Sequence, residues 1–148
     1  MLPDSPKFRI EGFNQLMWHQ RQATKSPRDL DHIQKATELA IRNETPARCF
    51  VAAQGEQLLV GALISNIGVG IQTGGYYLWI NDIHIMESHR NMGIGTKLLQ
   101  FVTNWAREND CLYMAASRDT DNLASQQLFA NAGWQQNEMT WMDTRLVT

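Results

Sequence analysis

A short loop with two glycines carries the strongest chemical signal in the sequence. It runs from Glu87 to Thr96 and separates a long apolar stretch from an amphipathic one. Gly93 and Gly95 let a ligand approach the backbone because neither has a Cβ. The amphipathic stretch is an expected helix, so its unpaired N–H groups and the positive end of its dipole face the same point. Arg90 adds a permanent positive charge with forked donors. The loop therefore predicts an anion site suited to a pyrophosphate.

Three interpretations of this loop compete. The dinucleotide-binding fingerprint requires a third glycine, where this chain has Leu98. A Walker loop requires Gly-Lys-Ser/Thr, whereas the order here is Gly95-Thr96-Lys97. The third interpretation is a plain strand-to-helix turn in which the glycines serve backbone geometry alone.

The residues around the loop predict the elements that position it. Tyr76–Met86 is a candidate long strand, and Gly95–Glu108 is a helix with an apolar stripe. Cys111–Ala116 follows as a strand and Leu123–Ala132 as a short helix, with Gly133 as its left-handed terminator. Alternation along the long strand places Tyr77, Trp79, Asn81, Ile83 and Ile85 on one face, and Tyr76, Leu78, Ile80, Asp82 and His84 on the other.

The N-terminal third is less clearly patterned. Residues 1–15 are interpreted as an arm and Leu16–Ala23 as a first strand. A helix start is predicted over Ser26–Asp29, with Ser26 as its cap, and the helix is expected to end near Asn43.

The remaining segments complete the predicted sheet. Cys49–Ala53 and Gln57–Ile67 are expected to form a hairpin, a second turn falls at Thr73–Gly75, and Trp134–Leu146 is expected to supply one or two closing strands. The predicted fold class is α/β (α+β): a mixed, mostly antiparallel central sheet flanked by helices, with one β-α-β unit.

Four motifs, in the same order along the chain, resemble those of the GNAT N-acetyltransferases. The family signature Arg/Gln-x-x-Gly-x-Gly/Ala, which binds the pyrophosphate of acetyl-CoA, is matched by Arg90-Asn91-Met92-Gly93-Ile94-Gly95. Arg21–Thr24 resembles the family's first strand, and Asp29-Leu30 its helix start. Trp79–Ile85 resembles the central strand, and Asn122–Trp134 the late helix. The likeness covers residues 16–146 and is greatest to the diamine- and histone-type branch. It implies a single GNAT domain over residues 16–148, which contains the β-α-β acetyl-CoA-binding unit.

The resemblance implies a set of acetyl-CoA-binding residues. Main-chain groups of the central strand would hold the pantetheine arm as a surrogate strand, the loop would hold the pyrophosphate, and the late helix would line the thioester end. By position these residues are Ile83, His84, Ile85, Arg90, Asn91, Met92, Gly93, Ile94, Gly95, Thr96, Asn122, Ser125 and Phe129. Two of them have simpler interpretations, since Asn122 suits a helix cap and Ser125 a solvated helix surface.

The usual acid and base of the family are missing from this sequence. Phe129 stands where the family has its general-acid tyrosine, and Asn81-Asp82 replaces the Glu-Asp pair of the diamine enzymes. Asp82 and His84 are the remaining catalytic candidates, because a carboxylate can bind or deprotonate an amine and an imidazole titrates near neutral pH. The alternatives are that Asp82 is paired structurally and that His84 is simply packed.

Composition limits the class of protein. A length of 148 residues suits one domain, and a net charge of −2 without a basic run disfavours a nucleic-acid binder. No apolar stretch reaches the ~20 residues of a membrane span, and the N-terminus does not resemble a signal peptide, so we expect a cytoplasmic protein. Cys49 and Cys111 match no metal or redox spacing, so no metal is expected and both thiols are predicted to be buried.

The leading functional hypothesis is an N-acetyltransferase that transfers the acetyl group of acetyl-CoA to a primary amine by direct attack in a ternary complex. A small amine or amino compound is the expected acceptor, with a protein lysine as the alternative. A non-catalytic acyl-CoA-binding module and a purely structural domain are the competing classes. We also expect a homodimer in which a terminal segment of one chain approaches the acceptor side of the other.

Overall fold

A four-stranded sheet forms the centre of the computed structural model, which describes residues 1–24 and 27–147. Its order is β1 (Ala47–Gln54), β2 (Leu58–Gly70), β3 (Gly75–Ile85) and β4 (Cys111–Ala116). The first two pairings are antiparallel and the β3–β4 pairing is parallel. Helix α3 (Ile94–Glu108) forms the crossover between β3 and β4, so the predicted mixed sheet and β-α-β unit are confirmed.

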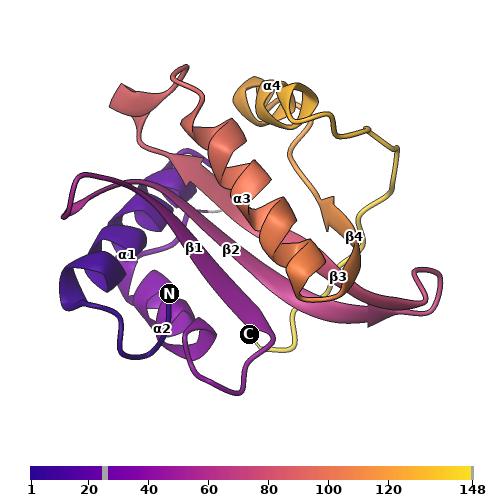
Figure 1. The fold of residues 1–148 in the computed structure, drawn as a ribbon, viewed down its shortest axis with the longest axis horizontal. Coiled ribbons are helices and arrows are strands. Elements are labelled where there is room, and N and C mark those ends of the chain that lie inside the picture. The colour runs from indigo at the N-terminus through magenta and orange to yellow at the C-terminus, as the bar shows by residue number, and fades with distance from the viewer. Residues whose placement is uncertain (25–26, 148) are drawn as a thin grey trace.

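Helices cover both faces of this sheet, and each face has its own hydrophobic core (Figure 1). One face packs against α3, where the most deeply buried side chains are Leu63, Leu78, Ile80, Leu99 and Val102. The other packs against α1 (Lys7–Gln22) and α2 (Leu30–Ala40), with Phe13, Leu16, Met17, Leu59 and Ala62 in its core. The predicted burial of Cys49 and Cys111 is confirmed, with one thiol in each core.

Helix α1 replaces the first strand predicted from the sequence. It runs from Lys7 to Gln22, so the prediction of a strand over Leu16–Ala23 is wrong, and so is the likeness of Arg21–Thr24 to a family first strand. Residues 7–15, interpreted as part of an arm, are helical as well. The helix forms because Phe13, Leu16 and Met17 recur at helical spacing and bury one face against the sheet.

A β-bulge in β3 reverses the predicted faces of that strand. Ser65 pairs with Ile80 and Ile64 with Asp82, so Asn81 is an extra residue without a partner on β2. Ile83 and Ile85 consequently share the α3 face with Leu78 and Ile80. Asp82 and His84 lie opposite Ile64 and Ala62, on the α1 face. The prediction of simple alternation through residue 85 is therefore wrong beyond Asn81.

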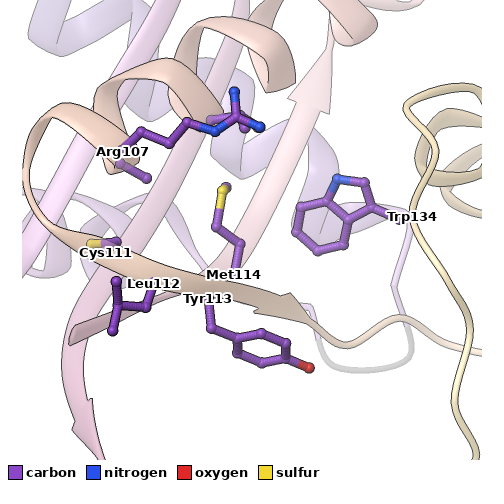
Figure 2. Close-up of a pocket in the computed structure, with 8 residues that line it drawn as sticks. Arg107, Cys111, Leu112, Tyr113, Met114 and Trp134 are labelled. Carbon is purple, nitrogen blue, oxygen red and sulfur yellow. The ribbon is translucent and has the colours of Figure 1, made fainter. Parts of the chain in front are cut away.

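The chain after β4 forms a helix but not the predicted closing strands. Helix α4 (Leu123–Asn131) has Ala132 as its C-cap, and Gly133 follows with a φ of 80°, left-handed as expected. Residues 134–147 contain neither a helix nor a strand, so the prediction of strands over Trp134–Leu146 is wrong. Trp134 instead borders a shallow hollow of about 280 Å³ beside β4 (Figure 2). We call it the β4 hollow; it is lined by Thr103, Ala106, Arg107, Cys111, Leu112, Tyr113, Met114 and Trp134.

Candidate active site

Strands β3 and β4 stop pairing halfway along β3, which leaves a gap in the sheet beside the last part of β3. Their pairing ends at Ile80 and Ala116, whereas β3 continues to Ile85 with β2 as its only partner among the described strands. The β4-side backbone of β3 is thus open over its last five residues. An extended ligand that enters this gap meets the same main-chain groups that a neighbouring strand would meet.

Alternation decides which main-chain groups point into the gap. The N–H of Met86 donates to the carbonyl of Val60 over 2.8 Å, so the backbone of Met86 faces β2 and that of Ile85 faces away from it. The same alternation turns the backbone of Ile83 into the gap and that of His84 toward β2. Of the three residues predicted to bind pantetheine through their main chain, Ile83 and Ile85 therefore face the gap, although the carbonyl of Ile85 already accepts a hydrogen bond from Arg90.

The N-terminus of α3 lies beyond the end of β3 and leaves its donors unpaired. Gly93 is the N-cap residue, in a left-handed conformation with φ of 78°, and no described side chain caps the helix. The N–H of Lys97 bonds to the carbonyl of Gly93, so the three preceding helical N–H groups, those of Ile94, Gly95 and Thr96, point outward. These donors and the positive end of the dipole are groups that could hold an anion, as the sequence predicts for this loop.

The two loop glycines have different structural roles. A Cβ on Gly93 would meet nothing within 4 Å, so glycine is favoured there by its positive φ. A Cβ on Gly95 would lie 2.7 Å from Leu128 Cδ1 and 3.4 Å from Ile85 Cγ1. Gly95 therefore allows α3 to pack closely against α4 and β3. This differs from the sequence interpretation, in which both glycines leave space for the ligand itself.

Arg90 joins the loop to the end of β3. Its Nε donates to the carbonyl of Ile85 over 3.0 Å, which fixes the base of an otherwise exposed side chain. The remaining guanidinium donors stay available beside the α3 N-terminus. Asn91, with a positive φ of 61°, and Met92 are both exposed in the same turn.

The two catalytic candidates lie together on the α1 face of β3. Asp82 accepts a hydrogen bond from the guanidinium of Arg21 (Nη2–Oδ1 2.5 Å), so its carboxylate is paired across α1 and β3. Burial, together with the positive charges of Arg90 and His19, lowers the pKa of His84 from 6.5 to about 4. At neutral pH the site therefore contains an uncharged imidazole and a paired carboxylate.

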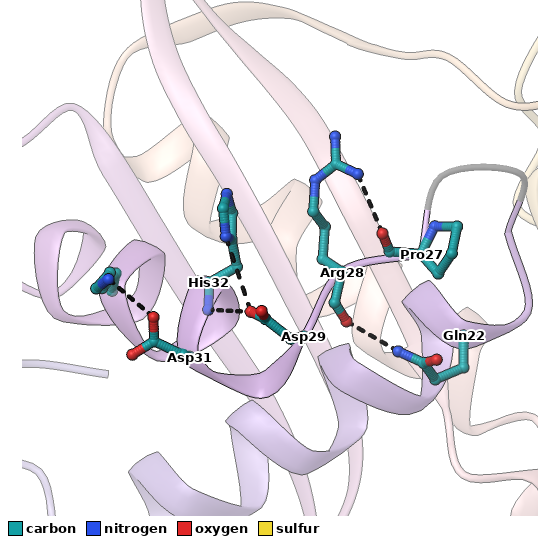
Figure 3. A network of polar contacts seen from close by, with 7 residues as sticks. Gln22, Pro27, Arg28, Asp29, Asp31 and His32 are labelled. Atoms are coloured by element: carbon teal, nitrogen blue, oxygen red, sulfur yellow. Dashed lines mark hydrogen bonds and ion pairs between the residues drawn. The ribbon is translucent and has the colours of Figure 1, made fainter. Parts of the chain in front are cut away.

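Polar contacts join the end of α1 to the segment that leads into α2 (Figure 3). The side-chain amide of Gln22 donates to the carbonyl of Arg28 over 2.8 Å. Asp29 caps α2, since its carboxylate accepts from the N–H of His32 over 2.9 Å. The cap predicted at Ser26 falls outside the described residues.

The pH dependence of stability follows from His84. Its pKa in the folded protein lies below 6.5, so as the pH falls the unfolded chain binds a proton first. The unfolding free energy should therefore be constant above about pH 6.5 with respect to this group, and should decrease between about pH 6.5 and 4. We expect His84→Gln to reduce that decrease in urea unfolding at pH 7, 6, 5 and 4. An equal acid sensitivity in both proteins would contradict this assignment.

Helix α4 contributes a cap and an aromatic ring to the site. The side-chain oxygen of Asn122 accepts from the N–H of Ser125 over 3.1 Å, so the capping interpretation of Asn122 is confirmed. Phe129 packs against the α3-side core, with its ring 4.8 Å from that of Trp134. Phe129 has no hydroxyl to protonate a leaving thiolate.

Sequence reasoning missed an aromatic surface on the α1 face. Trp79 pairs with Asn66, and Tyr77 pairs with Tyr113, so the three rings lie on the same side of the sheet. The side chains of Asn66 and Asn81 hydrogen bond to each other over 2.6 Å at its border. We call these five residues the aromatic face. Its signal was present in the alternation of Tyr77 and Trp79, but their partners become known only with the strand register.

The residues that the structure describes contain neither a cluster of metal ligands nor a membrane-spanning helix. Among them, no three His, Cys, Asp or Glu side chains are grouped so as to hold a metal ion. No helix within 1–24 and 27–147 is long and apolar enough to cross a membrane.

A family model and known structures match this architecture. Residues 10–134 match the model of the acetyltransferase (GNAT) family. A possible acetyltransferase from Clostridium difficile 630 superimposes with a TM-score of 0.81 at 12% identity, covering 97% of this chain and 95% of that one. Aminoglycoside N-acetyltransferase AAC(6')-Iy, in complex with CoA, superimposes with a TM-score of 0.79 at 17% identity, covering 95% and 91%. At these identities the two structures show a common fold.

One curated relative is similar in sequence over a short stretch. Aminoglycoside N(6')-acetyltransferase type 1 from Acinetobacter haemolyticus is 27% identical over 60 residues, 40% of this chain and 41% of the relative. The match thus spans less than half the length of that relative. Two of these relatives are named as aminoglycoside acetyltransferases and none as a diamine or histone enzyme, so the predicted likeness to the diamine- and histone-type branch is not supported.

Proposed function

The chain belongs to the acetyltransferase (GNAT) family, and from this premise we propose that it transfers the acetyl group of acetyl-CoA to a primary amine of a small amino compound. The transfer proceeds by direct attack within a ternary complex. The observation that carries the proposal is the convergence of the β3–β4 gap with the uncapped N-terminus of α3. The β3–β4 gap holds the extended arm of the ligand, and the N-terminus of α3 holds its pyrophosphate.

The residues on the CoA side fit such a ligand. The main-chain groups of Ile83 and the N–H of Ile85, which face the gap, hold the pantetheine arm. The N–H groups at the start of α3 and the guanidinium of Arg90 hold the pyrophosphate. When bound, acetyl-CoA supplies an activated acetyl thioester. The residues that border the gap would orient that thioester, and a fixed orientation can supply a large part of the barrier reduction in acyl transfer.

The acceptor binds on the α1 face, next to Asp82 and His84. The aromatic face provides ring surfaces and an amide pair, a combination suited to a cyclic compound with hydroxyl and amino groups. An aminoglycoside amino group is the first acceptor to test, because named relatives act on that class. Asp82, held by Arg21, is the candidate that orients the attacking amine, and the neutral His84 is the second candidate.

A non-catalytic acyl-CoA-binding module is the second candidate function, favoured by Phe129 at the general-acid position. Thiol release with acetyl-CoA and a panel of acceptors separates the two: an aminoglycoside, a neutral amino sugar, a diamine and a lysine peptide. We expect turnover with the aminoglycoside or the amino sugar. Tight CoA binding in calorimetry without any turnover would favour the module, and turnover with the lysine peptide alone would overturn the small-amine acceptor.

A further inference from the structure

The ion pair between Arg21 and Asp82 leaves several of its hydrogen-bonding groups free. Its one contact joins Nη2 of Arg21 to Oδ1 of Asp82 over 2.5 Å. The two side chains are 30% and 19% exposed, so a ligand in solvent can reach the pair. Within residues 1–24 and 27–147, neither Oδ2 of Asp82 nor Nε and Nη1 of Arg21 has a hydrogen-bond partner. An open carboxylate oxygen therefore lies beside open guanidinium donors.

The pair lies on the side of the sheet that we propose for the acceptor. Asp82 faces α1, and the aromatic face lies on the same side of the sheet. The imidazole of His84 is uncharged there, because burial and the positive charges of Arg90 and His19 lower its pKa. The charges that act on this imidazole are thus positive, which favours an acceptor with a negatively charged group.

Two adjacent opposite charges are complementary to a zwitterion. Arg21 compensates the charge of Asp82, so a purely cationic acceptor must share this carboxylate with a guanidinium that repels it. A compound with both an amine and a carboxylate meets the opposite charge at each position. Hydrogen bonds between a guanidinium and a carboxylate are also among the strongest in proteins, because both partners are charged and their geometries match.

We propose that Arg21 determines acceptor specificity and that the acceptor is a small cyclic amino acid, with a primary amine and a carboxylate on one ring. This inference rests on the proposed function, since it names the acceptor class of the same transfer. The amine bonds to Oδ2 of Asp82, the carboxylate bonds to Nε and Nη1 of Arg21, and the ring packs against the aromatic face. In the transfer the neutral amine forms a bond to the acetyl carbon, the C–S bond breaks, and CoA leaves as the thiol with the proton that the amine loses.

Three ring amines isolate the effect of acceptor charge. 3-Aminocyclohexanecarboxylate, its carboxamide and 1,3-cyclohexanediamine have the same ring and the same reacting amine, and they are a zwitterion, a monocation and a dication. With acetyl-CoA and the unsubstituted protein, we expect kcat/KM to be about 10-fold higher for the carboxylate than for the carboxamide, the loss expected for one charge-assisted hydrogen bond. The diamine should have the lowest kcat/KM of the three.

Substitution of Arg21 should change the order of the three acceptors. Arg21→Gln should remove the preference for the carboxylate and favour the diamine, because Asp82 is then unpaired. A purely structural role would lower all three kcat/KM values alike. Arg21→Lys keeps the charge without the forked donors and should restore part of the preference. Arg42→Gln removes an exposed arginine that follows α2 in the same layer, and this matched control should keep the original order.

Calorimetry with the CoA-bound protein separates this inference from the proposed function. If the carboxylate binds more tightly than the carboxamide, and Arg21→Gln removes that difference, the role of Arg21 stands even without turnover, and only the transferase proposal fails. Equal values for the carboxylate and the carboxamide would overturn the role of Arg21, whether they are found in turnover or in binding. A preference that survives Arg21→Gln, or no binding of the carboxylate, would overturn it as well.

Discussion

Gly95→Val is expected to weaken acetyl-CoA binding by roughly 10- to 100-fold. Each tenfold change in Kd corresponds to about 1.4 kcal/mol of binding free energy. A Cβ at this position would lie 2.7 Å from Leu128, and valine adds two further methyl groups. The first turn of α3 must therefore move away from α4 and β3, and its N–H donors move with it. Overpacking of this kind typically also costs about 1–3 kcal/mol of unfolding free energy. Calorimetry with CoA and urea unfolding measure the two effects.

A second substitution tests whether packing is the cause. Leu128→Ala removes the side chain that a Cβ would meet, so the double variant Gly95→Val/Leu128→Ala should bind CoA better than Gly95→Val. Gly93→Ala is the matched control for backbone conformation, because it adds a methyl group in open space at positive φ. Gly93→Ala should lower the unfolding free energy by about 1 kcal/mol. A folded Gly95→Val protein with wild-type CoA affinity would show that this packing does not control CoA binding.

Arg90→Ala should weaken CoA binding by about 10- to 150-fold, the equivalent of about 1.5–3 kcal/mol for a hydrogen bond to a charged group. The side chain is anchored by its Nε bond to the carbonyl of Ile85, which leaves the other guanidinium donors beside the α3 N-terminus. Arg90→Lys keeps the charge without that anchor and should give an intermediate affinity.

A shortened ligand makes this prediction specific to the pyrophosphate. Acetyl-pantetheine lacks the pyrophosphate, so Arg90→Ala should leave its kcat/KM unchanged. Lys97→Ala removes an exposed charge one turn further along α3 and controls for the general positive field. An equal loss with acetyl-CoA and acetyl-pantetheine would assign Arg90 a structural role instead.

The elements around the CoA side were predictable because their signals are local. The loop glycines, the apolar stripe of α3 and the β2–β3 turn each determine their structure within a few residues. Helix α1 had such a signal in Phe13, Leu16 and Met17, but Gly12 and the preceding prolines favoured an irregular arm. Burial against Leu59 outweighs that local preference. Gly12 allows this packing, since a Cβ at position 12 would lie 2.9 Å from Leu59 Cδ1.

The acceptor side was less predictable because it depends on strand register. One unpaired residue, Asn81, decides that Asp82 and His84 face α1, and nothing in the spacing of residues 76–86 shows where a bulge falls. The pairing of Asp82 with Arg21 joins residues 61 positions apart, which only the fold brings together. The predicted closing strands are absent for the opposite reason: residues 134–147 have a β-type composition, but they pair with no strand in the described part of the chain.

The two separate cores have a consequence for how the molecule opens. The layer of α1 and α2 packs on one face of the sheet, while β3, α3 and β4 are held by the core on the other. Partial unfolding can therefore release the first layer without disrupting the second. Amide protons of α1 and α2 should then exchange with solvent deuterium through a smaller opening than those of α3. The acceptor side would be the adaptable part of the protein, and the CoA side its stable framework.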